Sequence, residues 1–130
     1  GYADAQTDLG LLYYAGEAVE ADYAEAAKWL RKAAEQGDIG AQTLNGKLYI
    51  AGNGVKQDFA EAAKWLRMAA VKGCPDAEYT LGRMYLNGVG VEENKEEGLK
   101  LIRDAGEQGI REAKALLIEL SEDSAHLQEK

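Results

Sequence analysis

Residues 22–37 read DYAEAAKWLRKAAEQG, and nearly the same stretch returns at residues 58–73 as DFAEAAKWLRMAAVKG. A third and more divergent copy, NKEEGLKLIRDAGEQG, lies at residues 94–109. Each copy therefore begins 36 residues after the one before it. A fixed period of this length indicates a repeat array, in which each unit buries its apolar face by stacking on its neighbours.

Each copy carries the signals of a helix start and a helix end. The first residues of the three copies are Asp22, Asp58 and Asn94, and each is a good N-cap. A glutamate follows each of them three residues later, which is the spacing of a capping box. Each last residue is a glycine that should end the helix. A second apolar pattern of helical period precedes the first copy, at Ala5, Leu9, Leu12 and Tyr13. The sequence thus predicts three hairpins of a helix A and a helix B, over residues 1–36, 37–72 and 73–108.

Glycines recur in the middle of helix A, at Gly10, Gly46 and Gly82. A glycine inside a helix costs about 1 kcal/mol relative to alanine. We expect a close approach of helix B at these positions, where any side chain would clash. Ala26 and Ala62 on helix B fit the same crossing.

The last segment, residues 109–130, keeps part of the repeat pattern but has no second helix after it. We expect a capping helix from residue 111 to about 127 with a polar outer face, as the end of a solenoid requires. Gly1 lies in the register of Gly37, so the sequence leaves open whether the chain is a fragment of a longer array.

The repeated pattern resembles the Sel-one-like repeat (SLR), a relative of the tetratricopeptide repeat (TPR) with a slightly longer period. The residues that carry it are AQTDLGLLYYAGEAVEADYAEAAKWLRKAAEQG, AQTLNGKLYIAGNGVKQDFAEAAKWLRMAAVKG and AEYTLGRMYLNGVGVEENKEEGLKLIRDAGEQG. Asn45 departs from the pattern, where a leucine is expected. The resemblance implies an all-α fold, a right-handed α-solenoid of three two-helix repeats plus the C-terminal capping helix. It also implies that the A helices line a concave face, and that the chain is a scaffold or adaptor for a protein or peptide partner.

Charge and hydropathy narrow the possible partners. The net charge of −8 argues against nucleic acid, which needs a basic face. Residues 37–72, with five basic and three acidic residues, are the exception at +2. No run approaches the length of a transmembrane helix, so we expect a soluble chain without membrane insertion. No targeting segment is visible after Gly1, which leaves cytoplasmic, periplasmic and secreted locations open.

Catalytic and metal chemistry find few residues to use. Cys74 and His126 are the only residues of their types, and neither Ser121 nor Ser124 opens an S-x-x-K motif. We therefore expect no enzyme activity, no metal and no cofactor. A subset of small bacterial Sel-one-like proteins has a disulfide in each repeat and is linked to β-lactams, and this chain lacks those cysteines. The alternatives left open are a β-lactam-binding or hydrolysing enzyme of that subset and a structural spacer within a longer repeat protein.

Positions that vary between repeats are free to serve a partner. On helix A, three such positions lie at i, i+4 and i+7 beside the core face. The expected ligand-binding residues are Thr7, Leu11 and Tyr14, then Thr43, Lys47 and Ile50, then Tyr79, Arg83 and Leu86. Among these residues, Tyr14, Ile50 and Leu86 should form an apolar row from repeat to repeat. The alternative is that this row is partly buried against helix A of the next repeat. The sequence does not indicate the partner's identity or the oligomeric state.

Overall fold

The computed structural model describes residues 20–128, with side chains described for residues 23–122. The described residues form six helices and no strand: α2 Glu20–Glu35, α3 Ile39–Ala51, α4 Phe59–Val71, α5 Pro75–Asn87, α6 Lys95–Glu107 and α7 Arg111–Gln128. The predicted all-α class is confirmed. Helices α3 and α5 are the A helices of the second and third repeats, whereas α2, α4 and α6 are the B helices. The predicted helix A of the first repeat lies outside the described residues.

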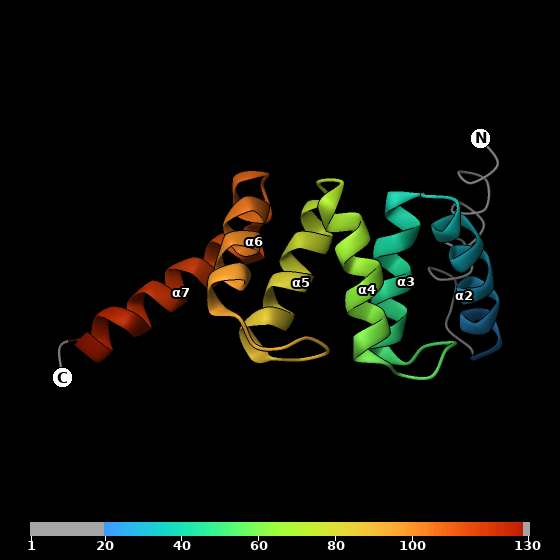
Figure 1. Ribbon diagram of the computed structural model, residues 1–130, viewed down its shortest axis with the longest axis horizontal. Coiled ribbons are helices and arrows are strands. Elements are labelled where there is room, and N and C mark those ends of the chain that lie inside the picture. Colours follow the sequence, from blue (N-terminus) through green and yellow to red (C-terminus); the bar gives the residue numbers. More distant parts are fainter. Residues whose placement is uncertain (1–19, 129–130) are drawn as a thin grey trace.

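The helices α2 to α6 stand side by side in one row, and α7 leaves the row at an angle (Figure 1). Within a repeat, α3 packs on α4 and α5 packs on α6. Between repeats, α2 packs on α3, α4 on α5 and α6 on α7. Because each helix contacts mainly its neighbours in chain order, the structure is a solenoid of helical hairpins.

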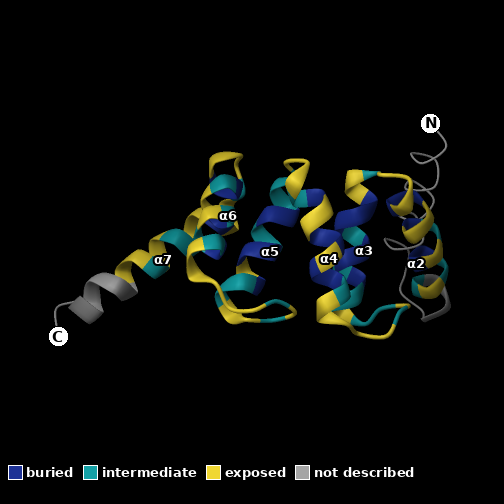
Figure 2. Cartoon of the chain, in the orientation of Figure 1, coloured by how far each residue is buried: buried dark blue, intermediate teal, exposed yellow. Residues whose placement is uncertain are grey.

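The buried residues lie along the seams where helices meet, whereas the outer faces are mostly exposed and the loops are exposed or partly buried (Figure 2). Three core clusters follow one another along the row. Their large, fully buried side chains include Leu30 and Leu48 in the first cluster, Leu66 in the second and Ile102 in the third. Trp65 of α4 joins the first cluster, so that cluster links the first and second repeats.

Helix α4 and helix α6 begin at the predicted N-caps. The Asp58 side chain accepts a hydrogen bond from the Glu61 N–H at 3.0 Å, and Asn94 does the same for Glu97 at 3.1 Å. The backbone N–H groups of Asp58 and Asn94 donate to the carbonyl oxygens of Tyr49 and Tyr85, at 3.0 and 2.9 Å. These bonds tie the start of helix B to the end of helix A in the same repeat.

The predicted N-cap at Asp22 is wrong, because α2 begins two residues earlier, at Glu20. Glu20 and Ala21 are good helix formers, and acidic residues in the first turn interact favourably with the helix dipole. The connection before α2 also differs in sequence, since the first repeat has Ala18 in the register where the second repeat has Gly54.

The predicted close crossing at the mid-helix glycines is confirmed for the two that the structure describes. A Cβ on Gly46 would lie 2.7 Å from Leu66 Cγ and 3.2 Å from the Ala62 carbonyl oxygen. A Cβ on Gly82 would lie 2.8 Å from Ile102 Cγ1. Helix B therefore occupies the space that a side chain on helix A would need.

Two loop glycines make a second close contact, between repeats, which is not among the features predicted from the sequence. Gly54 and Gly90 have φ angles of +75° and +73°, in the left-handed region. A Cβ on Gly54 would overlap the Tyr23 carbonyl oxygen, and one on Gly90 would overlap the Phe59 carbonyl oxygen. In the second and third repeats, the connection between helix A and helix B thus rests on the start of helix B in the preceding repeat.

The C-terminal helix α7 agrees closely with the predicted capping helix. Ala113 is fully buried, and Leu116 and Leu117 pack on the third core cluster. The outward side carries mainly polar residues, although Ile118 is 61% exposed. One face of α7 therefore packs on the last repeat, and its opposite face is exposed.

Candidate functional site

The surface formed by the A helices α3 and α5, here called the A-helix face, carries six of the predicted ligand-binding residues. Thr43, Lys47 and Ile50 lie on α3, and Tyr79, Arg83 and Leu86 lie on α5. The other three predicted residues, Thr7, Leu11 and Tyr14, lie outside the described residues. The six described residues do not share one environment, and the differences decide which of them a partner can reach.

Thr43 is not accessible, and this corrects its place in the predicted binding surface. Its side chain is buried, with 4% of the residue exposed. Its hydroxyl donates to the Ile39 carbonyl oxygen at 3.1 Å and lies 3.3 Å from Cys74 Sγ. Because Cys74 immediately precedes α5, the first position of the α3 row is buried in the junction between two repeats.

Lys47 lies one turn further along α3 and forms an ion pair with the next repeat. Its Nζ is 2.5 Å from Asp76 Oδ2 on α5. The two side chains are 35% and 48% exposed. Exposed ion pairs contribute about 0–1 kcal/mol, so a carboxylate from a partner could compete for Lys47 at low cost.

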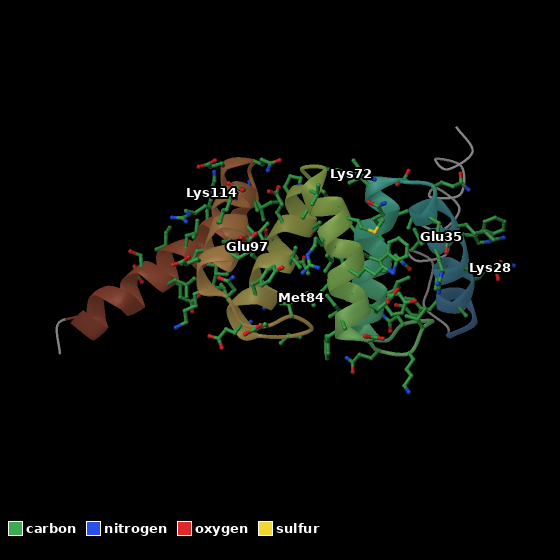
Figure 3. The ribbon with its side chains drawn as sticks, viewed as in Figure 1. Lys28, Glu35, Lys72, Met84, Glu97 and Lys114 are labelled. Carbon is green, nitrogen blue, oxygen red and sulfur yellow. The ribbon has the colours of Figure 1, made fainter. Side chains whose placement is uncertain are left out.

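A hollow of about 190 Å³ lies between α3 and α5, next to this ion pair along the A-helix face. It is lined by Ile50, Thr80, Arg83, Met84, Asn87 and Val89. Met84 is 5% exposed and is shared with the core between α4 and α5, in the lower centre of Figure 3. Arg83 and Asn87 are exposed at the rim. The hollow thus combines an apolar floor with a cationic and amide rim.

Tyr79 and Leu86 turn toward the third core cluster instead of the hollow. Both pack against the cluster around Ile102, and Leu86 lies where a Cβ on Gly98 of α6 would meet it at 2.9 Å. The Arg83 guanidinium carbon lies 5.6 Å from the centre of the Tyr79 ring. Ile50 and Leu86, the described members of the predicted apolar row, are therefore half-buried on different core clusters and do not form one continuous surface. Leu86 meets α6 of its own repeat, whereas the alternative placed the row against helix A of the next repeat.

Thr80, Asn87 and Val89 line the hollow but are not among the residues predicted from the sequence. Variation between repeats was a usable signal for the first two. Position 80 is aspartate in the first repeat and leucine in the second, and position 87 is alanine in both. Their contribution depends on the direction in which α5 faces α3, which a single sequence does not show.

A buried carboxylate lies near the start of α5. Glu78 is 6% exposed and accepts a hydrogen bond from the Gln108 side chain at 2.6 Å. Burial raises the pKa of the Glu78 carboxyl, and the nearby Asp104 raises this pKa further, against the opposing effect of the Gln108 hydrogen bond. In the second repeat the same position holds Gln42, whose amide donates to the Ala34 carbonyl oxygen at 3.2 Å. Gln42 therefore bonds the preceding repeat, whereas Glu78 bonds Gln108 within its own repeat, and only the third repeat has an ionisable residue in this register.

Two kinds of site are absent from the described part of the chain. No three His, Cys, Asp or Glu side chains in it lie close enough together to hold a metal ion. Among residues 20–128, no helix has both the length and the apolar character needed to cross a membrane.

Known repeat proteins share the sequence pattern and the fold of this chain. The model of the Sel1 repeat matches residues 3–38, 40–74 and 75–110. A protective antigen of uropathogenic Escherichia coli with an SLR fold is 43% identical, with a TM-score of 0.79 over 87% of this chain, which spans only 24% of that antigen. A Sel1 repeat protein of Oxalobacter formigenes is 38% identical, with a TM-score of 0.80 over 90% of this chain and 88% of its own.

A more distant solved structure shares the fold. Cysteine-rich protein B of Helicobacter pylori is 22% identical, with a TM-score of 0.71 and 88% of each chain covered. No curated protein matches this chain. Three consecutive matches to one repeat model cover most of the sequence, and they agree with the hairpins that the structure shows. The chain therefore belongs to the Sel1 repeat family, whose repeats generally mediate protein–protein interaction and are generally non-catalytic.

Proposed function

We propose that this chain is a non-catalytic scaffold, a single solenoid domain that binds a protein or peptide segment along its A-helix face. The observation that carries the proposal is the hollow between α3 and α5, which has an apolar floor and an exposed arginine at its rim. Few polar groups around an apolar floor are typical of a recognition site. The hollow spans the junction of two repeats, so a segment bound there crosses from one repeat to the next.

The partner segment places an apolar side chain in the hollow, against Ile50 and Met84. The Arg83 guanidinium binds a carboxylate of the same segment, because arginine presents several donors in a planar fork. A second carboxylate competes with Asp76 for Lys47. On sequence grounds, Thr7, Leu11 and Tyr14 of the first repeat continue this surface. Tyr79 and Leu86 pack on the third core cluster and so hold α5 in position.

The test compares variants that change the hollow with one that does not. Arg83→Ala removes the cation at the rim, and Asn87→Trp fills the hollow from an exposed position. Lys28→Ala is the control, because Lys28 points out from α2, well away from the hollow (Figure 3). Each variant is used as bait in affinity capture with mass spectrometry, after thermal unfolding has shown that it is folded.

We expect the wild-type chain and Lys28→Ala to retain a partner that both hollow variants lose. In a titration of that partner, truncation of a hot-spot arginine should cost about 2 kcal/mol, roughly thirtyfold in affinity. Unchanged affinity in both hollow variants would refute this surface. Turnover of a chromogenic β-lactam would support the enzyme alternative, and the lack of any captured partner would support the spacer alternative.

A further inference from the structure

Helix α4 carries an exposed stripe that differs from the same stripe in the neighbouring repeats. We call it the α4 stripe; its residues are spaced i, i+3, i+4, i+7 and i+8, so they share one face of the helix. Its members are Lys64, Arg67, Met68, Val71 and Lys72, and they line one shallow depression. All five are exposed, including Met68 at 40% and Val71 at 82%.

The fold does not require the two apolar residues of the stripe. The register of Met68 holds Lys32 in the first repeat and Asp104 in the third. The register of Val71 holds Glu35 and Glu107. Valine is also a weaker helix former than glutamate, so helix propensity does not favour it at this exposed position. Only the second repeat places apolar side chains on this surface.

The stripe is also more positively charged in the second repeat than in either neighbour. The α4 stripe has three basic residues and no acidic one, whereas the equivalent stripe has three basic residues and one acidic residue on α2, and two of each on α6. The Arg67 guanidinium donates to the Tyr85 hydroxyl at 2.7 Å, and Lys72 Nζ donates to the Gly37 carbonyl oxygen at 3.0 Å. Two of the three cations are thus held in place beside the apolar pair. The positive charge of this surface contrasts with the net charge of −8 of the whole chain.

We propose that the α4 stripe is a second docking site, separate from the A-helix face, for an acidic amphipathic segment of a partner protein. Apolar side chains of the segment cover Met68 and Val71, and its carboxylates pair with the three basic residues around them. The choice of an acidic occupant rests on charge complementarity, since the stripe has no acidic residue with which a basic segment could pair. The apolar contact supplies affinity, and the charges supply orientation and rate of association.

The probe is a synthetic amphipathic peptide with glutamate on one face and leucine on the other, titrated into the ¹⁵N-labelled chain. Two matched peptides are used beside it, one with lysine for glutamate and one with serine for leucine. The variant Met68→Lys with Val71→Glu carries the residues of the first repeat, so it should keep the fold. Lys64→Glu is a second variant, which reverses one exposed charge.

We expect the acidic leucine peptide to shift the amide signals of residues 64–72. Both variants should weaken its binding at least tenfold, and added salt should weaken it further. Neither matched peptide should bind comparably. Shifts confined to α3 and α5, unchanged binding by both variants, or equal binding of the serine peptide would each overturn the proposal. Shifts of residues 64–72 with protein concentration alone would overturn it in favour of a second copy of the chain.

Discussion

Replacing Asn45 by leucine should stabilise this protein, although most substitutions of buried residues destabilise. Asn45 is 1% exposed on α3. Its Nδ2 is buried and has no hydrogen-bond partner among the described residues. The same register holds Leu9 in the first repeat and Leu81 in the third. The second repeat therefore carries a polar group where its fold accommodates an apolar side chain of the same branched shape.

The size of the effect follows from burial. A buried polar group without a partner costs about 1–3 kcal/mol. Full burial of a leucine side chain contributes about 1.5–3 kcal/mol, from which some repacking cost must be subtracted. We expect a net gain of about 1–3 kcal/mol for Asn45→Leu. The reciprocal change, Leu81→Asn, loses both contributions and should cost about 3–5 kcal/mol.

Urea unfolding followed by circular dichroism measures both changes. With a denaturant slope of about 1–3 kcal/mol per molar, Asn45→Leu should raise the midpoint by roughly 1 M, and Leu81→Asn should lower it by more. Asn45→Asp serves as a control for a still more polar side chain and should lower the midpoint. An unchanged or lower midpoint for Asn45→Leu would show that the amide is satisfied in the native state, and the reasoning from its burial would fail.

Two further changes test the crossing and the buried carboxylate. Gly46→Leu should destabilise by about 1–3 kcal/mol or more, because Leu66 occupies the space that the new side chain needs. Gly40→Ala in the same helix meets only the Asp38 carboxylate at 3.4 Å and should keep or slightly raise the urea midpoint; equal effects of the two changes would contradict the crossing. Glu78→Gln should raise the midpoint at pH 7, because burial raises the pKa of the native carboxyl and its ionised form weakens the fold as the pH rises above about 4.5. That advantage should disappear below pH 4.5, where native and unfolded carboxyls are both protonated, and a gain independent of pH would point to a cause other than ionisation.

The sequence by itself determined the hairpin repeats, the helix starts at Asp58 and Asn94, and the capping helix. These features follow from local signals, and the 36-residue period repeats each signal in an independent copy. The mid-helix glycines were interpretable for the same reason. A glycine that lowers helix stability in every repeat indicates a close contact that every repeat makes. Here that contact is the crossing of Gly46 with Leu66 and of Gly82 with Ile102.

The tertiary structure alone decided which side chains a partner can reach. Periodicity places Thr43, Lys47 and Ile50 on one face of α3, but it does not fix how one hairpin is offset from the next. That offset buries Thr43 beside Cys74, joins Lys47 to Asp76 and leaves Ile50 at a hollow. It also brings the loop glycines Gly54 and Gly90 against the backbone of the preceding repeat. All these contacts join residues about 30 positions apart, and their geometry depends on the packing of whole helices, which the sequence of a single chain does not specify.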